Sequence, residues 1–285
     1  MEVLETKASS GYAKPPWLFK GSALYQLHLV KAATARSFIP EEFRLVEAFG
    51  YTLGGFFLAH YDDSPVGVFD ELVVIAGTVW NPPTSCAWAA RVLVNNREAC
   101  HHGRKDVGLP SHVAGFSKKK SAAITENASD KSNSFLSMIG IGSSLHNTKN
   151  QIDVKVTDVV SSSETQFCSI KLPTSLSSES SSTNRWMGPV VKMSLPSFSG
   201  KTEYNPQLLK YSCQIECRVR PVKTAQVSGP INSGDEDNLS GSQNLELVGT
   251  RERSISLLLS KPLLALQFNF LRMQVEAPTI VVKSS

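Results

Sequence analysis

Three consecutive lysines provide the most distinctive chemical feature of this sequence. They end the run Gly115-Phe116-Ser117-Lys118-Lys119-Lys120. A lysine held among other ammonium groups, or out of water, has a lowered pKa because its charged form is disfavoured. Its neutral amine can then attack a carbonyl carbon and form a Schiff base. A lysine triplet is also typical of a solvated surface, and composition alone leaves both interpretations open.

The cysteines and histidines do not follow a metal-site pattern. Cys213 and Cys217 lie in an alternating segment, which separates them by about 13 Å along a strand. One zinc ion with bonds of about 2.3 Å cannot bind both thiols. Cys100-His101-His102 contains suitable ligand types but has no second cluster at zinc spacing, and we interpret it as a polar loop. We expect buried, reduced thiols and neither a metal nor a cofactor.

The sequence patterns of common enzyme classes do not occur. There is no GxSxG, GxxxxGK[ST], GxGxxG or HExxH motif, so hydrolase, kinase and nicotinamide-enzyme interpretations have no support. Gly54-Gly55 lies inside an apolar run. There it predicts a bulge or a close backbone contact and not a phosphate loop.

Alternating apolar and polar residues, which indicate half-buried strands, recur along the chain. The pattern is clearest at Tyr211–Arg220, where Tyr211, Cys213 and Ile215 share one face. The sequence predicts further strands at Ala23–Val30, Thr52–His60, Glu71–Val79, Trp88–Val94, Gln151–Val156, Phe167–Leu172, Val190–Ser194, Ser254–Leu259 and Ala265–Gln274, and short helices at Lys31–Phe38, Ser134–Ile139 and Asn205–Leu209. Many strands between turn-rich segments favour a barrel or a sandwich.

The length and composition are consistent with one domain over residues 1–285. All-β barrels often reach about 200–250 residues as a single domain. Three polar segments, near 122–134, 174–183 and 228–241, contain too little apolar surface to offset the entropy lost on ordering. We expect them to be flexible insertions between strands.

Charge and hydropathy argue against several protein classes. The formal net charge is +4 and the only basic cluster is the lysine triplet, so nucleic acid is not an expected partner. No segment reaches the roughly 18 apolar residues of a membrane span. The N-terminus contains Glu2 and Glu5 and lacks the features of a secretory signal or a transit peptide. We expect a soluble intracellular protein, in the cytoplasm or the plastid.

Three short motifs resemble the acetoacetate decarboxylase family. Gly115–Lys119 is similar to that family's Gly-Phe-Pro-Lys-Lys signature, Gly67–Glu71 to its Gly-x-Tyr-x-Glu strand, and Phe38–Phe43 to its Leu-Pro-Glu segment. The resemblance implies a mainly β fold, an antiparallel β-barrel with a few short helices. It also implies that Lys118 forms the Schiff base, Lys119 lowers its pKa and Glu71 lines the active site.

The sequence departs from that family at three positions. Ser117 replaces the proline of the signature, Phe69 replaces the tyrosine, and Lys20 is the only basic residue where the family has an arginine that pairs with the substrate carboxylate. Arginine presents a rigid two-pronged donor to a carboxylate and lysine does not. These departures argue against decarboxylation of acetoacetate.

Over the whole chain, the sequence more closely resembles a plant family, the neoxanthin-deficient proteins. Lys14–Trp17, Gly50–Phe57 and Trp80–Ser85 carry this resemblance. It implies an accessory factor required for the biosynthesis of neoxanthin, a carotenoid, that does not itself convert violaxanthin into neoxanthin.

Three functions are compatible with these resemblances. In the first, the barrel holds a small apolar or carbonyl ligand, such as a xanthophyll or its precursor, beside Lys118 and Glu71. In the second, the protein is a Schiff-base enzyme that acts on an unknown carbonyl substrate through Lys118, with Lys119 and Glu71 in support. In the third, it is a scaffold that contacts enzymes of the carotenoid pathway.

Overall fold

Strands dominate the computed structural model, which describes residues 12–81, 84–123, 149–160, 163–172, 188–230 and 242–281. The strands are β1 (Trp17–Lys31), β2 (Glu47–Ala48), β3 (Tyr51–Asp63), β4 (Phe69–Asn81), β5 (Thr84–Val94), β6 (Ser111–Ala123), β7 (Lys149–Val160), β8 (Ser163–Leu172), β9 (Val190–Gly200), β10 (Leu208–Val222), β11 (Gln226–Ser228), β12 (Lys261–Val275) and β13 (Thr279–Ile280). The helices are α1 (Ala32–Arg36), α2 (Arg97–His102), the π-helical turn η1 (Gly103–Val107) and α4 (Ser242–Leu258).

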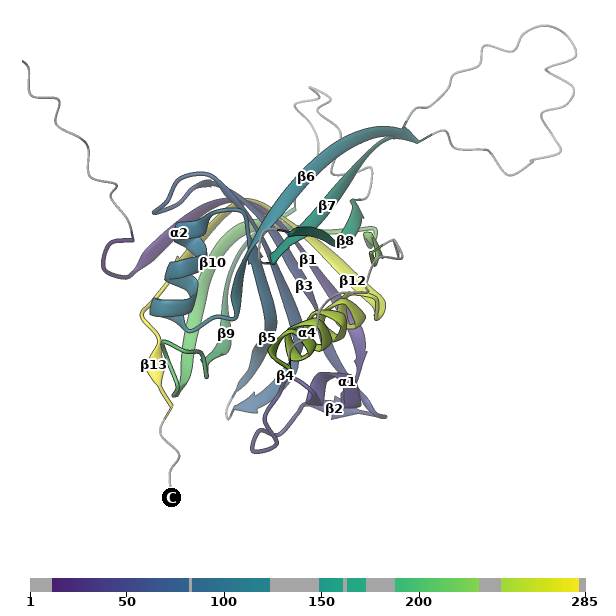
Figure 1. The fold of residues 1–285 in the computed structure, drawn as a ribbon. Helices are drawn as coiled ribbons and strands as arrows, with labels where there is room; N and C mark the ends of the chain where they lie inside the picture. The colour runs from purple at the N-terminus through teal and green to yellow at the C-terminus, as the bar shows by residue number, and fades with distance from the viewer. Residues whose placement is uncertain are drawn as a thin grey trace, which may run out of the picture.

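Seven strands close into a barrel (Figure 1). Around the wall they follow the order β5-β4-β3-β1-β12-β10-β9, each antiparallel to the next, and β9 returns to β5. The closing seam is parallel and consists of the pairs Ala87–Ser197 and Trp88–Phe198. The predicted mainly β fold with a barrel and few helices is therefore confirmed.

Close contact between β1 and β3 depends on glycine. A Cβ atom at Gly21 would overlap the carbonyl oxygen of His60, and one at Gly55 would overlap that of Gln26. Gly55 also has a φ of 132°, a conformation that residues with a side chain rarely adopt. The close backbone contact predicted at Gly54-Gly55 is thus present. It lets the two strands pair from Lys20 to Lys31.

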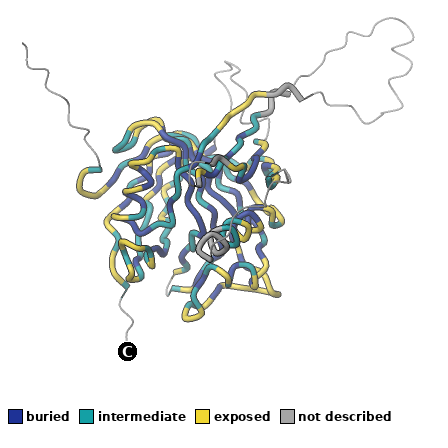
Figure 2. The backbone as a smooth tube through the Cα atoms, in the orientation of Figure 1, coloured by how far each residue is buried: buried dark blue, intermediate teal, exposed yellow. Residues whose placement is uncertain are grey.

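The alternation of side chains along the wall separates two hydrophobic cores. On β1, Trp17 and Phe19 point into the barrel, whereas Leu24 and Val30 point outward. The inward residues form a core around the barrel axis, and the outward ones pack under the second layer. Figure 2 shows the buried backbone concentrated in these strands, with exposed backbone at the loops.

The second layer consists of a sheet extension and a helix. Strand β6 leaves the barrel parallel to β5 and continues into the order β6-β7-β8-β11. Helix α4 packs against β3, β4 and α1. A buried ion pair joins this layer to the barrel, because Arg91 on β5 lies 2.5 Å from Asp158 on β7.

Two predicted elements are wrong. Ser254–Leu259 is not a strand but the end of helix α4, because a short apolar run does not distinguish a strand from a buried helix turn. Asn205–Leu209 is not a helix: Thr202 N–H donates to the Asn205 carbonyl in a turn, and β10 begins at Leu208. Helix α1 confirms the helix predicted at Lys31–Phe38.

Several predicted elements lie in residues outside the ranges that the structure describes. These are the helix at Ser134–Ile139, the insertion at 174–183, and most of the insertions near 122–134 and 228–241.

The predicted polar loop at Cys100-His101-His102 is instead the last turn of helix α2. The Asn96 side chain accepts hydrogen bonds from the backbone N–H groups of Glu98 and Ala99. This is a standard N-terminal helix cap, and it begins the helix that contains the segment predicted to be a polar loop.

Candidate functional site

The barrel encloses an apolar cavity of about 340 Å³. Most of its lining is aromatic or aliphatic. The wall includes Trp17, Phe19, Phe57, Phe69, Val73, Ala89, Val92, Met273 and Val275. A volume in this range and a lining of this composition are typical of small-molecule sites.

A hydrogen-bonded acid lies inside this apolar wall. The Tyr61 hydroxyl donates to Oε2 of Glu71 at 2.7 Å. Tyr61 and Glu71 come from β3 and β4, and both side chains point inward. Protein surrounds the carboxyl group, and the part of its surface that remains open faces the cavity.

Burial raises the pKa of the Glu71 carboxyl, while the hydrogen bond from Tyr61 acts in the opposite direction. Burial, followed by the influence of Glu71, raises the pKa of Tyr61 well above its usual value. Removal from water disfavours the charged form of both groups. The interior therefore disfavours charge on both groups, and their hydroxyl and carboxyl oxygens can exchange hydrogen bonds with an uncharged oxygen.

Further polar groups approach the cavity from β10. Tyr211 and Cys213 line it, as the alternating pattern of this strand predicted. Burial raises the pKa of the Cys213 thiol to about 12 and also raises that of Tyr211. Both groups therefore stay protonated at neutral pH and add uncharged hydrogen-bonding groups to the cavity wall.

An aromatic stack covers one region of the cavity. The ring of Tyr12 lies 3.5 Å from that of His102, centroid to centroid, and Trp17 meets the same histidine edge-on. Burial lowers the pKa of His102, and its contact with Asp106 acts in the opposite direction.

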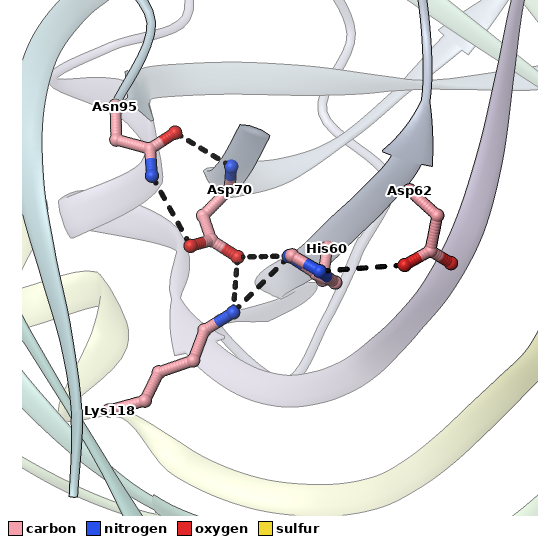
Figure 3. Close-up of polar contacts among 5 residues, drawn as sticks. All are labelled: His60, Asp62, Asp70, Asn95 and Lys118. Atoms are coloured by element: carbon pink, nitrogen blue, oxygen red, sulfur yellow. Dashed lines mark hydrogen bonds and ion pairs between the residues drawn. The ribbon is translucent and has the colours of Figure 1, made fainter. Parts of the chain in front are cut away.

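Lys118 lies outside the cavity, in a separate polar cluster (Figure 3). Its Nζ atom is 2.5 Å from Oδ1 of Asp70 and 3.3 Å from Nδ1 of His60. His60 Nδ1 is 2.8 Å from the same Asp70 oxygen, and Asn95 bonds to both the backbone N–H and the other carboxylate oxygen of Asp70. The lysine side chain is 41% exposed.

The sheet geometry separates Lys118 from Glu71. Asp70 and Glu71 are neighbours on β4, and successive side chains of a strand point to opposite faces. Glu71 therefore lines the barrel cavity, while Asp70 and Lys118 line a smaller crevice of about 250 Å³ on the outer face. The expectation that Lys118 and Glu71 share one pocket is not met.

Lys119 does not approach either group. It lies opposite Asp153 in the β6–β7 pair, on the other face of β6 from Lys118, and it is exposed. The structure thus places Lys118, Lys119 and Glu71 in three different surroundings.

Tyr61 is the main site residue that the sequence reasoning missed. Tyr61 is the residue after the end of the predicted strand Thr52–His60. Its inward orientation could be predicted only if the true end of the strand and its inner face were known. His102 was missed because its segment was interpreted as a loop. The strand alternation was the available signal for Tyr61.

Metal ligands and membrane helices are not found in the described ranges. No group of three histidine, cysteine or acidic residues is placed there to hold a metal ion. None of the helices in these ranges has the length and hydropathy needed to cross a bilayer.

Comparison with known proteins places this geometry in context. The chain is 59% identical over 288 residues to a protein of Arabidopsis thaliana named NEOXANTHIN-DEFICIENT 1, and the match covers 100% of both chains. The search against protein-family models found no match.

Two solved structures share the fold at low sequence identity. An acetoacetate decarboxylase superposes with a TM-score of 0.52 at 8% identity, over 95% of this chain and 91% of the other. The enduracididine biosynthesis enzyme MppR, in complex with pyruvate, gives a TM-score of 0.54 at 10% identity, over 96% and 93%. The predicted acetoacetate-decarboxylase-like fold is confirmed.

Proposed function

This chain belongs to the family of plant NEOXANTHIN-DEFICIENT 1 proteins, and we propose that it is an accessory factor of neoxanthin synthesis that binds a xanthophyll or a xanthophyll precursor in its barrel. The name of the relative supports the pathway. The mode of action is our inference from the cavity. The Tyr61–Glu71 hydrogen bond within apolar walls is the observation that carries it.

The chemistry of the cavity matches an apolar ligand that bears oxygen. Aromatic and aliphatic walls stabilise a hydrocarbon by removing it from water. The carboxyl group and the phenol can bond to a hydroxyl or another uncharged oxygen, and an uncharged ligand avoids the cost of burying a further charge. The cavity volume of about 340 Å³ suits the end group of a xanthophyll, whereas its long polyene would extend beyond.

The alternative, a Schiff-base enzyme centred on Lys118, has less support. A Schiff base forms when a neutral amine with a free lone pair attacks a carbonyl carbon. Lys118 instead donates to Asp70 at 2.5 Å, and Lys119 is not beside it. The pyruvate in the MppR structure describes that protein and not this one.

Titration with purified xanthophylls tests the proposed function. Violaxanthin and neoxanthin are added separately to the full chain, and the shift of the carotenoid absorption bands is followed. We expect saturable binding of at least one pigment. Tyr61→Phe removes the phenol hydroxyl, and Glu71→Gln replaces one carboxyl oxygen with an NH2 group. Each change should weaken binding about tenfold, the value of one buried hydrogen bond.

Glu216→Gln is the matched control. Glu216 lies on the outer face of β10, exposed and 3.3 Å from Lys192, so the same substitution there should leave the titration unchanged. If neither pigment shifts the spectrum, the ligand-binding role is wrong and the scaffold role becomes the better explanation.

Reductive trapping tests the alternative. The full chain is treated with borohydride in the presence of pyruvate and other oxo acids, and the tryptic peptides are weighed. We expect no added mass on Lys118, because its amine is committed to Asp70. A specific adduct there would support the enzyme instead.

A further inference from the structure

We propose that one end of the barrel docks on the surface of a lipid bilayer through an exposed apolar rim. The rim consists of Val46, Phe49, Tyr51, Leu53 and Trp80, whose exposed fractions are 41%, 101%, 37%, 46% and 43%. Single exposed apolar residues are ordinary, whereas a contiguous group indicates an interaction site.

Val46, Leu53 and Trp80 lie around Thr78, which itself lines the cavity. The Val46 N–H donates to the Thr78 carbonyl, and the Thr78 hydroxyl donates to the carbonyl of Leu53. Trp80 follows two residues later on the same face of β4 and pairs with Ser85, another residue of the cavity wall. The rim is therefore continuous with the cavity.

Side-chain orientation places the rim on the inner side of the barrel end. Leu45 and Val79 form a bridge and are both buried in the outer core. Because strand residues alternate between faces, Val46 and Trp80 point to the opposite side. Figure 1 shows β2 and the end of β4 at the same end of the barrel.

Phe49 extends from the tip of the β2–β3 hairpin. It is fully exposed and has a φ of 52°, followed by Gly50 with a φ of 77°. Turns of this kind favour glycine or asparagine, and a bulky residue in this conformation is an outlier. Phe49 is a strained aromatic residue at a protruding tip, and no described contact compensates for the strain. This points to a partner outside the chain.

The composition and charge of the rim match a bilayer of lipids that have no net charge. Tyrosine and tryptophan are enriched where membranes meet water, since their rings are apolar at one end and polar at the other. The charged residues next to the rim have both signs. Lys31 pairs with Tyr51, the Arg44 carbonyl accepts from the Trp80 N–H, and Glu47 follows Val46; all three charged residues are exposed. A mixed border of this kind does not select anionic headgroups.

A bilayer explains the rim better than a protein partner does. A protein would need a pocket that receives the protruding hairpin, whereas a bilayer accepts any apolar tip. The choice also rests in part on the proposed function, because a protein that binds a lipophilic ligand must obtain it from a membrane.

Flotation with pigment-free phosphatidylcholine vesicles tests this inference. The full chain is compared with Phe49→Gly, which removes the aromatic and suits the positive φ, and with Trp80→Ser. We expect the unmodified protein to float with the vesicles and each variant to partition about tenfold less, since burial of one large apolar side chain is worth about that much in an equilibrium constant.

Phe270→Gly is the matched control. Phe270 also has a φ of 52° and is 70% exposed, but it lies beside the Gly21 end of β1, about 26 Å from the rim at roughly 3.3 Å per residue. This variant should float like the unmodified protein. Thermal unfolding of each variant confirms that it is folded.

Two outcomes would overturn the proposal: no flotation of the unmodified protein, or equal flotation of folded Phe49→Gly and Phe270→Gly. Vesicles that contain anionic lipids form a second arm, and binding only to those would contradict the match to lipids that have no net charge. Because no pigment is present, failure here is distinct from failure of the xanthophyll titration.

Discussion

At the scale of single residues, the molecule separates two acids that are neighbours in the sequence. Asp70 accepts from Lys118 on the outer face, and Glu71 accepts from Tyr61 inside the barrel. The Asp70 carboxylate, which is 12% exposed, is thereby committed to an ion pair, and the Glu71 carboxyl is kept in an apolar cavity. Their different surroundings follow from the alternation of a single strand.

Glu71 should make stability depend on pH. Burial raises the pKa of Glu71 in the folded state. The contribution of Glu71 to the free energy of unfolding is therefore fully present below the unfolded pKa, and it is lost as the pH rises through the folded pKa. Glu71→Gln keeps an acceptor for Tyr61 but cannot ionise. We expect the variant to gain melting temperature relative to the unmodified protein at pH 8 and to gain less at pH 4.

Thermal unfolding followed by circular dichroism at the two pH values measures this difference. A gain on the order of 1 kcal/mol corresponds to about 2–4 °C in a chain of this size. A melting-temperature difference that is the same at both pH values would show that Glu71 does not titrate between them.

The sequence motifs predicted Glu71 as a pocket residue but could not place Lys118 correctly. The resemblance assigned both residues to one site, because motifs report residue type and order. Which face of β6 carries Lys118 depends on where this strand leaves β5 to pair with β7. That long-range pairing is not encoded within the motif itself.

At the scale of elements, the tight contact between β1 and β3 should make Gly55 intolerant of a side chain. Gly55→Ala would place a Cβ atom on the Gln26 carbonyl in a positive-φ conformation. We expect a loss of several kcal/mol in the free energy of unfolding, on the order of the worst backbone effects. Urea denaturation measures it.

Gly249→Ala serves as the comparison, because Gly249 lies in helix α4 with open space around its Cβ position. Alanine favours a helix over glycine by about 1 kcal/mol, so this variant should be slightly more stable. Equal effects at the two positions would contradict the close contact in the wall.

The ion pair between the two layers should also contribute strongly. Asp158→Ala leaves Arg91 buried without its partner at 2.5 Å and also removes the neighbour of Arg251. Breaking a buried pair in this way typically costs about 3–5 kcal/mol. Asp63→Ala, which breaks the exposed pair with Lys20, should cost less than about 1 kcal/mol. Urea denaturation of both variants should reveal this contrast.

Sequence patterns identified most strands but misassigned helix α4. The period-two signal of β10 was strong because one face is polar and the other lines the barrel. Among its described side chains, helix α4 packs Ile255, Leu257 and Leu258 into the outer core. Such a short apolar run is compatible with either structure, and only its packing against β3 and β4 decides between them.

At the scale of the whole molecule, the wall of the barrel is not equally strong around its circumference. Strands β1 and β3 pair from Lys20 to Lys31, whereas β5 and β9 meet at two residue pairs. Local opening requires less free energy where fewer interactions must be broken. We expect the backbone amides that donate across this seam, among Ala87, Trp88, Ser197 and Phe198, to exchange with solvent faster than those in the centre of β1.

Hydrogen exchange followed by mass spectrometry tests this expectation in the ligand-free protein. Addition of a xanthophyll that binds should slow amide exchange at the seam if the ligand contacts both β5 and β9. Uniform protection around the wall would show that the seam is as stable as the other pairings.

The short parallel pairing of β5 with β9 affects how a long ligand can enter the barrel. A barrel whose strands are all extensively paired admits a ligand only through one of its ends. A rigid polyene with a bulky ring at each end passes through a narrow barrel with difficulty. A barrel with one short seam can open along that seam, admit one end group of the ligand and close around it while the polyene stays outside. If the proposed xanthophyll binding is right, the β5–β9 seam is where the wall opens with the smallest loss of strand pairing, and it is the expected place for an end group to enter from the side.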